Sequence, residues 1–219
     1  MKHLRTIISG ILAGLAISIG GMVSIYLKSI DVNNLVVSAI LFSFGLLTIC
    51  SFSFSLYTGR IAYIIDNHKP SYIVELLEML LGNTIACVVL GLITRALRIY
   101  PTMEDTLSSV CGAKNNDNIL SLFFLAFLCG ILVYLAVEIF KSKHHPIIRL
   151  IGLIFSVSIF VILGFEHVIA DIYYFSAAPS FSPKALLTIL IILIGNSLGS
   201  ICFHILKKIV LKDNEKKEA

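Results

Sequence analysis

Charged residues are scarce in this chain. Only 14% of its 219 residues are Asp, Glu, Lys or Arg, whereas an ordinary soluble domain carries about 25%. Hydrophobic residues make up 58% of the sequence and the mean hydropathy is +0.96, against about 45–50% apolar residues in soluble domains. This composition excludes an ordinary soluble domain and indicates a membrane protein.

Cysteine pairs and metal-ligand patterns are also missing. No two cysteines form a C-x-x-C motif, and four of the five lie inside apolar segments, where a free cysteine behaves as a small hydrophobe. His144 and His145 are adjacent but have no further ligands beside them. We therefore expect no disulfide framework, no metal site and no cofactor. The cysteines are Cys50, Cys87, Cys111, Cys129 and Cys202.

Long apolar segments dominate what remains. A membrane-spanning helix needs roughly 20 apolar residues, and six segments meet this requirement. The loops between them are mostly too short for a soluble domain. We predict an all-α polytopic membrane protein with six transmembrane helices, forming one domain over residues 1–219 and ending in a short charged cytoplasmic tail at residues 212–219. The six segments are Thr6–Leu27, Asn34–Tyr57, Tyr72–Thr94, Ile119–Phe140, Ile147–Ala170 and Ala185–Leu206.

The distribution of lysine and arginine predicts the orientation. If the N-terminus is cytoplasmic, the inner loops and tails hold twelve Lys and Arg residues and the outer loops hold five. Because cytoplasmic loops are the richer in these residues, we expect both termini in the cytoplasm and the chain in the cell membrane. The first apolar segment is too long for a signal peptide. Membrane topology explains the formal charge of +4, so we expect no nucleic-acid partner.

The two halves of the sequence share short patterns. Residues 10–17 resemble residues 130–137 in the first and fourth segments, and Gly82-Asn83 in the third matches Gly195-Asn196 in the sixth. Each half then holds three helices, an odd number, so the halves must enter the membrane from opposite sides. We predict two inverted repeats, about residues 1–100 and 115–211, as in many transporters.

The second and fifth segments carry polar stretches that a plain membrane helix would not need. Residues 51–56 alternate serine with phenylalanine or leucine, a period of two that suits extended chain. Residues 164–171 place Gly, Glu, His and Asp inside an apolar run. Non-helical backbone at membrane depth persists only inside protein or along a wet cavity. We predict that both segments are helix–loop–helix elements.

These motifs resemble those of the formate/nitrite transporter family, which includes hydrosulfide channels. Residues 164–173 (Gly-Phe-Glu-His-Val-Ile-Ala-Asp-Ile-Tyr) are similar to the family's G-F-E-H-S-V-A-N-M-Y, and residues 56–59 (Leu-Tyr-Thr-Gly) to its L-F-T-G. The resemblance covers nearly the whole chain. It implies an aquaporin-like protomer, a homopentamer with a pore in each subunit, and passage of small monovalent anions or their conjugate acids.

The resemblance also assigns residues. It implies a central pore histidine at His167, a threonine at Thr58 in the loop that breaks the second helix, and an anion-attracting lysine at Lys114. Three positions depart from the family pattern: Ser55 replaces a glutamate, and Gly130 and Asp171 replace asparagines. The apolar constrictions implied are Phe42, Leu46, Leu56 and Phe160.

Each of these three polar residues also has a simpler structural interpretation. His167 could be a structural histidine, Thr58 could satisfy the broken backbone, and Lys114 could be a solvated loop charge. Five further residues are expected to support the broken helices: Asn83 and Asn196 by bonding their loops, Glu166 by bonding loop amides, Ser55 within the first break, and Asp171 after the second. Asp171, four residues after His167, either pairs with it or lies in water at the outer mouth.

Three functions remain open at this point. The leading hypothesis is a channel or transporter, not an enzyme, for formate, nitrite or hydrosulfide, with pH dependence through His167. An intramembrane hydrolase is the second, suggested by Ser197 and nearby histidines, but His204 is two helical turns from Ser197, too far for a direct hydrogen bond. The third is a membrane assembly protein with no pore.

Overall fold

The structure, a computed structural model, describes residues 1–179 and 182–218. It is 84% helical and, over the described residues, contains no strand, which confirms the all-α prediction. Two short 3₁₀ helices, η1 and η2, follow α1 and α2. In chain order the elements are α1 (Lys2–Ile30), η1 (Val32–Asn34), α2 (Leu35–Phe52), η2 (Ile61–Ile65), α3 (Pro70–Thr94), α4 (Tyr100–Asn116), α5 (Ile119–Lys141), α6 (Pro146–Ile162), α7 (Val168–Ala177) and α8 (Lys184–Glu218).

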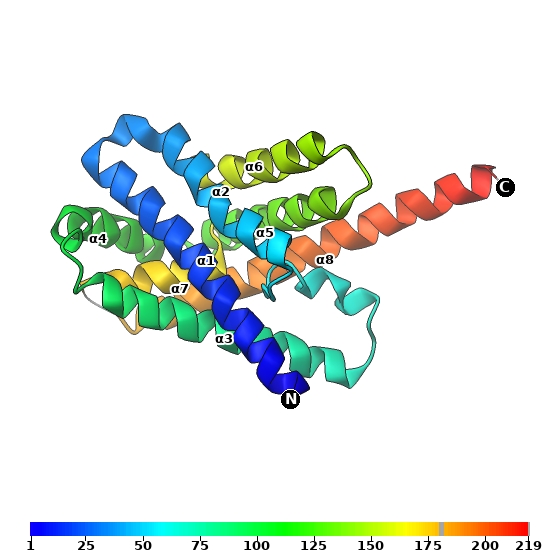
Figure 1. Cartoon of the computed structure of the whole chain (residues 1–219), viewed down its shortest axis with the longest axis horizontal. Coiled ribbons are helices and arrows are strands. Elements are labelled where there is room, and N and C mark those ends of the chain that lie inside the picture. Colours follow the sequence, from blue (N-terminus) through cyan, green and yellow to red (C-terminus); the bar gives the residue numbers. More distant parts are fainter. Residues whose placement is uncertain (180–181, 219) are drawn as a thin grey trace.

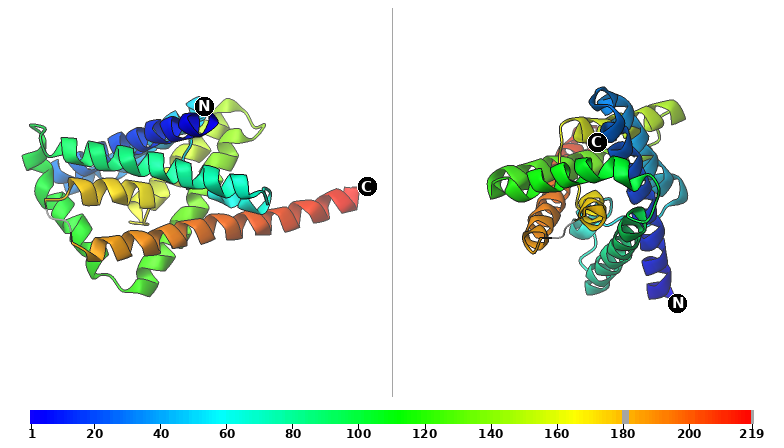
Figure 2. Two further views of the ribbon diagram at one scale, coloured as in Figure 1. Left: turned by 90° about the horizontal axis from the view of Figure 1, so that it is seen from below. Right: turned by 90° about the vertical axis from the view of Figure 1, so that its left-hand side faces the viewer.

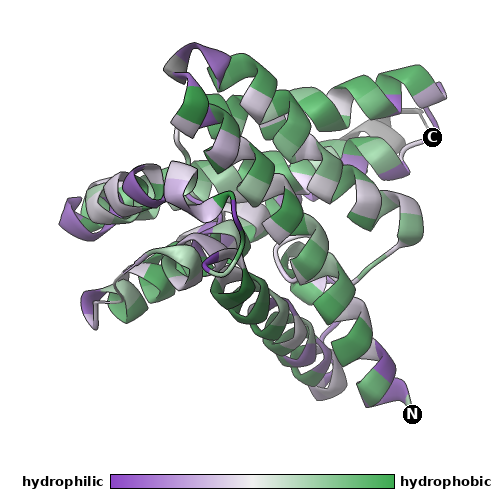
Figure 3. Ribbon diagram, turned by 60° about the vertical axis from the view of Figure 1, so that its left-hand side comes forward, coloured by the Kyte–Doolittle hydropathy of each residue, from purple (hydrophilic) through white to green (hydrophobic). Residues whose placement is uncertain are grey.

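Five helices are long and apolar enough to cross a membrane: α1, α2, α3, α5 and α8 up to Leu211. Helices α6 and α7 are shorter. Large apolar side chains on the outside of the bundle are exposed, for example Leu77, Leu120 and Phe155 at 58–67%, and apolar surface runs along the helices in Figure 3. An apolar surface of this extent requires a lipid environment.

The helices pack in matching pairs. Helix α1 lies along α3, α5 along α8, and α2 beside α6 (Figure 1). Glycines allow the first two pairs to approach closely: a Cβ atom on Gly10 would lie 2.9 Å from the Met79 carbonyl oxygen, and one on Gly195 would lie 2.6 Å from the Ala126 Cβ atom. Helix α7 lies in the middle of the surrounding helices (Figure 2), and eight of its ten residues are buried.

Both polar stretches interrupt a helix. Helix α2 ends at Phe52, before the predicted Tyr57, because Ser53 adopts the left-handed conformation (φ 58°) and its N–H caps the Ile49 carbonyl. Helix α6 ends at Ile162, and Gly164 (φ +67°) turns the chain before α7 begins. The apolar segments Asn34–Tyr57 and Ile147–Ala170 therefore each contain a helix end followed by non-helical chain, at the places where the sequence predicted interruptions.

Two elements differ from the sequence prediction. The first break is followed by only five residues of 3₁₀ helix, because Lys69 is extended ahead of Pro70, which begins α3. Helix α4 lies where a loop was expected. Its buried residues, Met103, Leu107 and Cys111, recur every four positions and form one helical face.

The C-terminal helix continues without a break through most of the predicted tail. Helix α8 begins at Lys184 and extends past the end of the bundle to Glu218 (Figure 1). Ala219, the last residue of that predicted tail, lies outside the described residues.

Candidate functional site

The two interruptions meet at a hydrogen bond between Thr58 and His167. His167 is the N-cap residue of α7, and its Nδ1 atom accepts a hydrogen bond from the Ala170 backbone N–H at 3.3 Å. In a neutral imidazole the proton then sits on Nε2, which donates to Thr58 Oγ1 at 2.9 Å. Thr58 is 1% exposed and His167 3%. The two residues are far apart in the chain but share one buried contact.

A buried asparagine on α3 holds the first interruption. The Asn83 Oδ1 atom accepts a hydrogen bond from the Tyr57 N–H at 3.0 Å, and its Nδ2 atom donates to the Ser55 carbonyl at 3.0 Å. The same Nδ2 atom donates to the Gly10 carbonyl on α1 at 2.8 Å. Backbone groups released by a helix break must find partners inside the membrane, and this side chain supplies two of them.

A second buried asparagine, on α8, repeats the arrangement at the other interruption. The Asn196 Oδ1 atom accepts from the Val168 N–H at 2.9 Å. Its Nδ2 atom donates to the carbonyls of Glu166 and Ala126, both at 2.7 Å. Each asparagine therefore binds one N–H and one carbonyl of its break and one carbonyl of a neighbouring long helix.

Aromatic and aliphatic side chains close the space on either side of the histidine. The Phe42 ring meets the Phe160 ring edge-on with centroids 5.7 Å apart, and Phe160 stacks on His167 at 5.9 Å. Leu56 is 2% exposed and lies in the first break, two residues before Thr58. Leu46 is equally buried.

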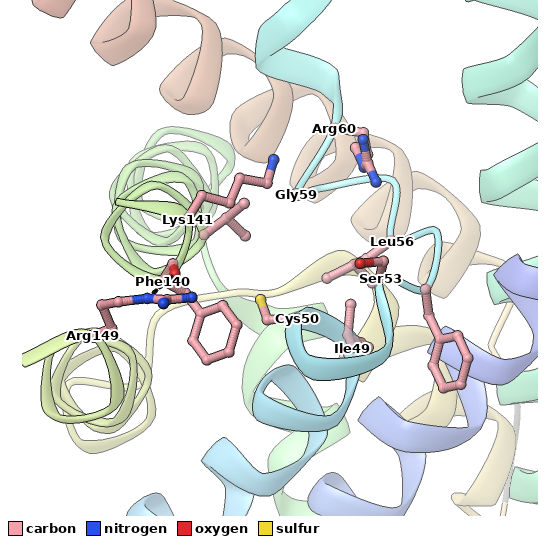
Figure 4. Close-up of a pocket in the computed structure, with 11 residues that line it drawn as sticks. Ile49, Cys50, Ser53, Leu56, Gly59, Arg60, Phe140, Lys141 and Arg149 are labelled. Carbon is pink, nitrogen blue, oxygen red and sulfur yellow. Dashed lines mark hydrogen bonds between the residues drawn. The ribbon is translucent and has the colours of Figure 1, made fainter. Parts of the chain in front are cut away.

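A cavity lies on each side of this closure. One, of about 220 Å³, is lined by Phe42, Phe160 and His167, together with Lys28 and Lys114. The other, of about 240 Å³, is lined by Leu56 and by residues of α2, α5 and α6 (Figure 4). Of the four predicted constriction residues, only Leu46 lines neither cavity.

Lys114 lies in a buried ion cluster on the His167 side. Its ammonium group pairs with Glu166 and, at 2.9 Å, with Asp171. The three side chains are 10%, 7% and 1% exposed respectively. Burial disfavours the ammonium form, but the two carboxylates outweigh this effect and hold the pKa of Lys114 above its ordinary value.

This cluster corrects three expectations. Lys114 is neither in a loop nor solvated, because it belongs to α4 and its side chain is only 10% exposed. Asp171 is neither at a watery mouth nor paired with His167: helix α7 directs it to Lys114, and His167 turns back to cap that helix. The Glu166 carboxylate binds Lys114, while the backbone carbonyl of Glu166 meets Asn196.

Comparisons with known proteins place these features in a family. A sequence model described as "Formate/nitrite transporter" matches residues 1–210. The chain belongs to the formate/nitrite transporter family. Two solved structures share the fold of this family member. One, an FNT family ion channel, has a TM-score of 0.77 and 19% identity, over 95% of this chain and 89% of the other. Another, a pentameric formate channel with formate bound, has a TM-score of 0.76 and 20% identity, over 96% of each chain. Among curated proteins no sequence matches significantly.

The departures from the formate/nitrite transporter motifs have structural counterparts. Gly130 has no room for a side chain, since a Cβ atom would overlap the Asn196 carbonyl oxygen. Asp171 adds a second carboxylate beside Lys114. Ser55 contributes its backbone: its N–H donates to Ser9 Oγ at 2.9 Å.

The serine and histidine that suggested a hydrolase do not meet. Ser197 Oγ donates to the Leu193 carbonyl at 2.7 Å and lies 3.0 Å from the Tyr57 hydroxyl. The His204 ring instead contacts the Tyr134 hydroxyl and the Asp66 carboxylate, both at 2.8 Å. A nucleophile and its base need direct contact, and the described residues offer none here.

Four basic residues that no sequence motif singled out also line the cavities. Lys28 joins Lys114 on the His167 side, and Arg60, Lys141 and Arg149 line the cavity beyond Leu56. Their sequence signal was weak because they adjoin apolar segments, where basic residues are usual.

Proposed function

We propose that this chain is a membrane channel, and not an enzyme, that passes small monovalent anions or their conjugate acids. Formate, nitrite and hydrosulfide are the candidate substrates. The observation that carries the proposal is the buried hydrogen bond between Thr58 and His167, which lies where two interrupted helices meet. One cavity adjoins it directly and the other begins at Leu56, two residues away.

The apolar side chains around His167 explain why a proton-exchanging group is useful there. A bare anion that enters a dry constriction loses its hydration, at a cost of several kcal/mol or more, whereas a neutral acid loses far less. The rings of Phe42 and Phe160 form such a surface beside the imidazole. We infer that His167 exchanges a proton with the permeant species at this point, helped by Thr58, so that transport depends on pH.

Lys114 and Lys28 are proposed to attract the anion into the cavity on the His167 side. A cleft lined by one sign of charge raises the local concentration of the opposite ion. The carboxylates of Glu166 and Asp171 oppose this attraction, so Lys28, which forms no ion pair among the described residues, supplies the uncompensated charge.

Flux measurements test the proposal directly. Purified protein in lipid vesicles should carry formate at a rate well above that of empty vesicles, and the rate should change between pH 5 and pH 8. His167→Phe should abolish the pH dependence and reduce flux by about 100-fold or more, the usual contribution of a positioned proton-transfer group. His68→Phe is the matched control, because His68 is exposed and outside both cavities.

Two results would contradict this proposal. If formate enters protein-containing vesicles no faster than empty ones, a non-conducting assembly protein becomes the better hypothesis. If His167→Phe conducts normally with an unchanged pH profile, the histidine has a structural role only.

We further propose that the chain works as a homopentamer in the cell membrane with both termini cytoplasmic. The pentameric formate channel that shares its fold supports the first part, and the distribution of Lys and Arg supports the second. The mass of the detergent-solubilised particle tests the assembly. Protease access to the C-terminus in sealed, oriented vesicles tests the orientation.

A further inference from the structure

Three cations line the cavity beyond Leu56. Arg60 follows the first break, Lys141 ends α5, and Arg149 lies in the first turn of α6, so three separate elements bring positive charge to one space of about 240 Å³ (Figure 4). The C-terminal end of α5 and the start of α6, which carry Lys141 and Arg149, lie at the end of the bundle from which α8 extends (Figure 1). Cys50 and Ser53 also line it.

These three cations have no carboxylate partner. Over the side chains that the structure describes, no ion pair joins Arg60, Lys141 or Arg149 to an acidic group. Two carboxylates, Glu138 and Asp66, pair instead with Lys207 and Lys208 of α8. Neither carboxylate lines the cavity.

The side chains keep donors available. Arg149 uses its Nε–H on the Phe140 carbonyl at 2.5 Å and lies over the Phe140 ring, which leaves the terminal guanidinium N–H groups unused. Lys141 donates one hydrogen bond, to the Tyr63 hydroxyl at 3.0 Å, and keeps two further N–H groups. A guanidinium group matches the oxygens of phosphate in a two-pronged geometry, and an ammonium adds a point charge.

We propose that this cavity binds a phosphate-type dianion: free inorganic phosphate, a small phosphomonoester, or the phosphomonoester headgroup of a lipid. Three cations without a carboxylate partner exceed what one monovalent permeant anion can neutralise, and a dianion comes closer to balancing their charge. Ordinary basic residues flanking a membrane span would not need to converge on one cavity from three elements.

A bound dianion would close the path from this end. Leu56 lines the cavity two residues before Thr58, and crossing such an apolar side chain is far more costly for a dianion than for a neutral acid. The dianion would therefore remain at the cavity and occupy the space through which formate must pass. The block depends on the proposed channel function, but the binding does not.

Cys50 provides a test that needs no transport. Its thiol lines the cavity and is partly exposed, so a bound dianion should shield it from N-ethylmaleimide, followed by mass spectrometry of the Cys50 peptide. Phosphate at ten times its dissociation constant should slow alkylation about tenfold, because only the unoccupied fraction reacts. Cys202, which is exposed and outside this cavity, should react at the same rate with and without phosphate. Chloride at equal ionic strength is the salt control.

Variants test the assignment of the cations. Arg60→Gln and Arg149→Gln should each reduce the protection of Cys50 by phosphate at least fivefold, as loss of a charged hydrogen bond of about 1.5–3 kcal/mol predicts. Lys143→Gln removes the same charge from an exposed position outside the cavity and should leave protection intact. If phosphate gives no protection in the native protein, and vesicles containing phosphatidic acid give none either, the proposal is wrong.

Two further experiments distinguish a lipid headgroup from free phosphate and test whether the bound dianion blocks formate flux. Protection by phosphatidic acid in place of dissolved phosphate would assign the site to a lipid headgroup, and protection by phosphate in phosphatidylcholine vesicles would assign it to the free ion. Phosphate on this side should then inhibit formate flux in the native protein and spare flux in Arg60→Gln. Protection of Cys50 without any formate flux would support the site while contradicting the channel function.

Discussion

Replacing Asn196 by alanine should destabilise the protein by at least about 3 kcal/mol. The substitution removes three hydrogen bonds, to the Val168 N–H and to the carbonyls of Glu166 and Ala126. The side chain is 0% exposed, so water cannot replace it. A buried polar group left without a partner costs about 1–3 kcal/mol, and three such groups give about 3 kcal/mol as the lower bound.

Thermal unfolding in detergent measures this effect. In a chain of this size each kcal/mol shifts the unfolding midpoint by about 2–4 °C, so a fall of about 6–12 °C is expected. Asn83→Ala should behave alike, because that side chain makes the same three kinds of hydrogen bond. The control is Asn118→Ala, in which an exposed N-cap side chain loses its bond from the Ser121 N–H and a long, exposed one to the Asp117 carboxylate; about 1 kcal/mol is expected there.

The comparison between the variants decides whether the reasoning holds. If Asn196→Ala shifts the midpoint no more than Asn118→Ala does, the backbone of the second break finds other partners, and the asparagine is not what holds it. A large shift for Asn196→Ala with none for Asn83→Ala would show that the two breaks are supported differently, against the matching geometry described above.

Two further predictions concern the ion cluster and the helix packing. Asp171→Asn leaves Lys114 with one carboxylate, and removing a negative charge worth about 1 kcal/mol beside the pathway should raise formate flux about fivefold. A flux equal to or below that of the native protein would refute this prediction. Gly130→Ala forces a methyl group against the Asn196 carbonyl and should destabilise by about 1–3 kcal/mol. Gly112→Ala, where no atom lies within 4 Å of the added methyl, should not destabilise, and equal unfolding midpoints for the two variants would contradict the packing argument.

The helix breaks could be predicted from the sequence because their signals are local. Alternating serines before Thr58 fit no helical face, and Gly164 precedes a group of ionisable residues. In a membrane such residues have few favourable positions, so their presence indicates an interior, non-helical segment. The exact residues at which α2 and α6 end were harder to predict, because apolar residues continue beyond both ends.

The partners of the buried charges could not be predicted in the same way. Lys114 and Asp171 are 57 positions apart in the sequence, and the helix that carries Lys114 was expected to be a loop. Its apolar face repeats only three times, at Met103, Leu107 and Cys111, a pattern too short to stand out beside six long apolar segments. Because α4 was not predicted, the only partners that could be proposed for Asp171 were the nearby His167 and water.

Because the chain has few polar residues, only a small number of hydrogen-bonded pairs is possible in its interior. The sequence does not show which of these pairs form. Their positions on the same helix suggested a pair between Ser197 and His204. Ser197 instead contacts Tyr57, which is 140 residues away in the sequence. Every buried polar group in a membrane needs a partner, so a sequence with few such groups limits the combinations. Helix packing then chooses one of them, and in this chain the choice depends on close approach at glycines such as Gly10 and Gly195. Polar motifs therefore identify which residues meet at the centre, while the small residues between them determine which pairs form.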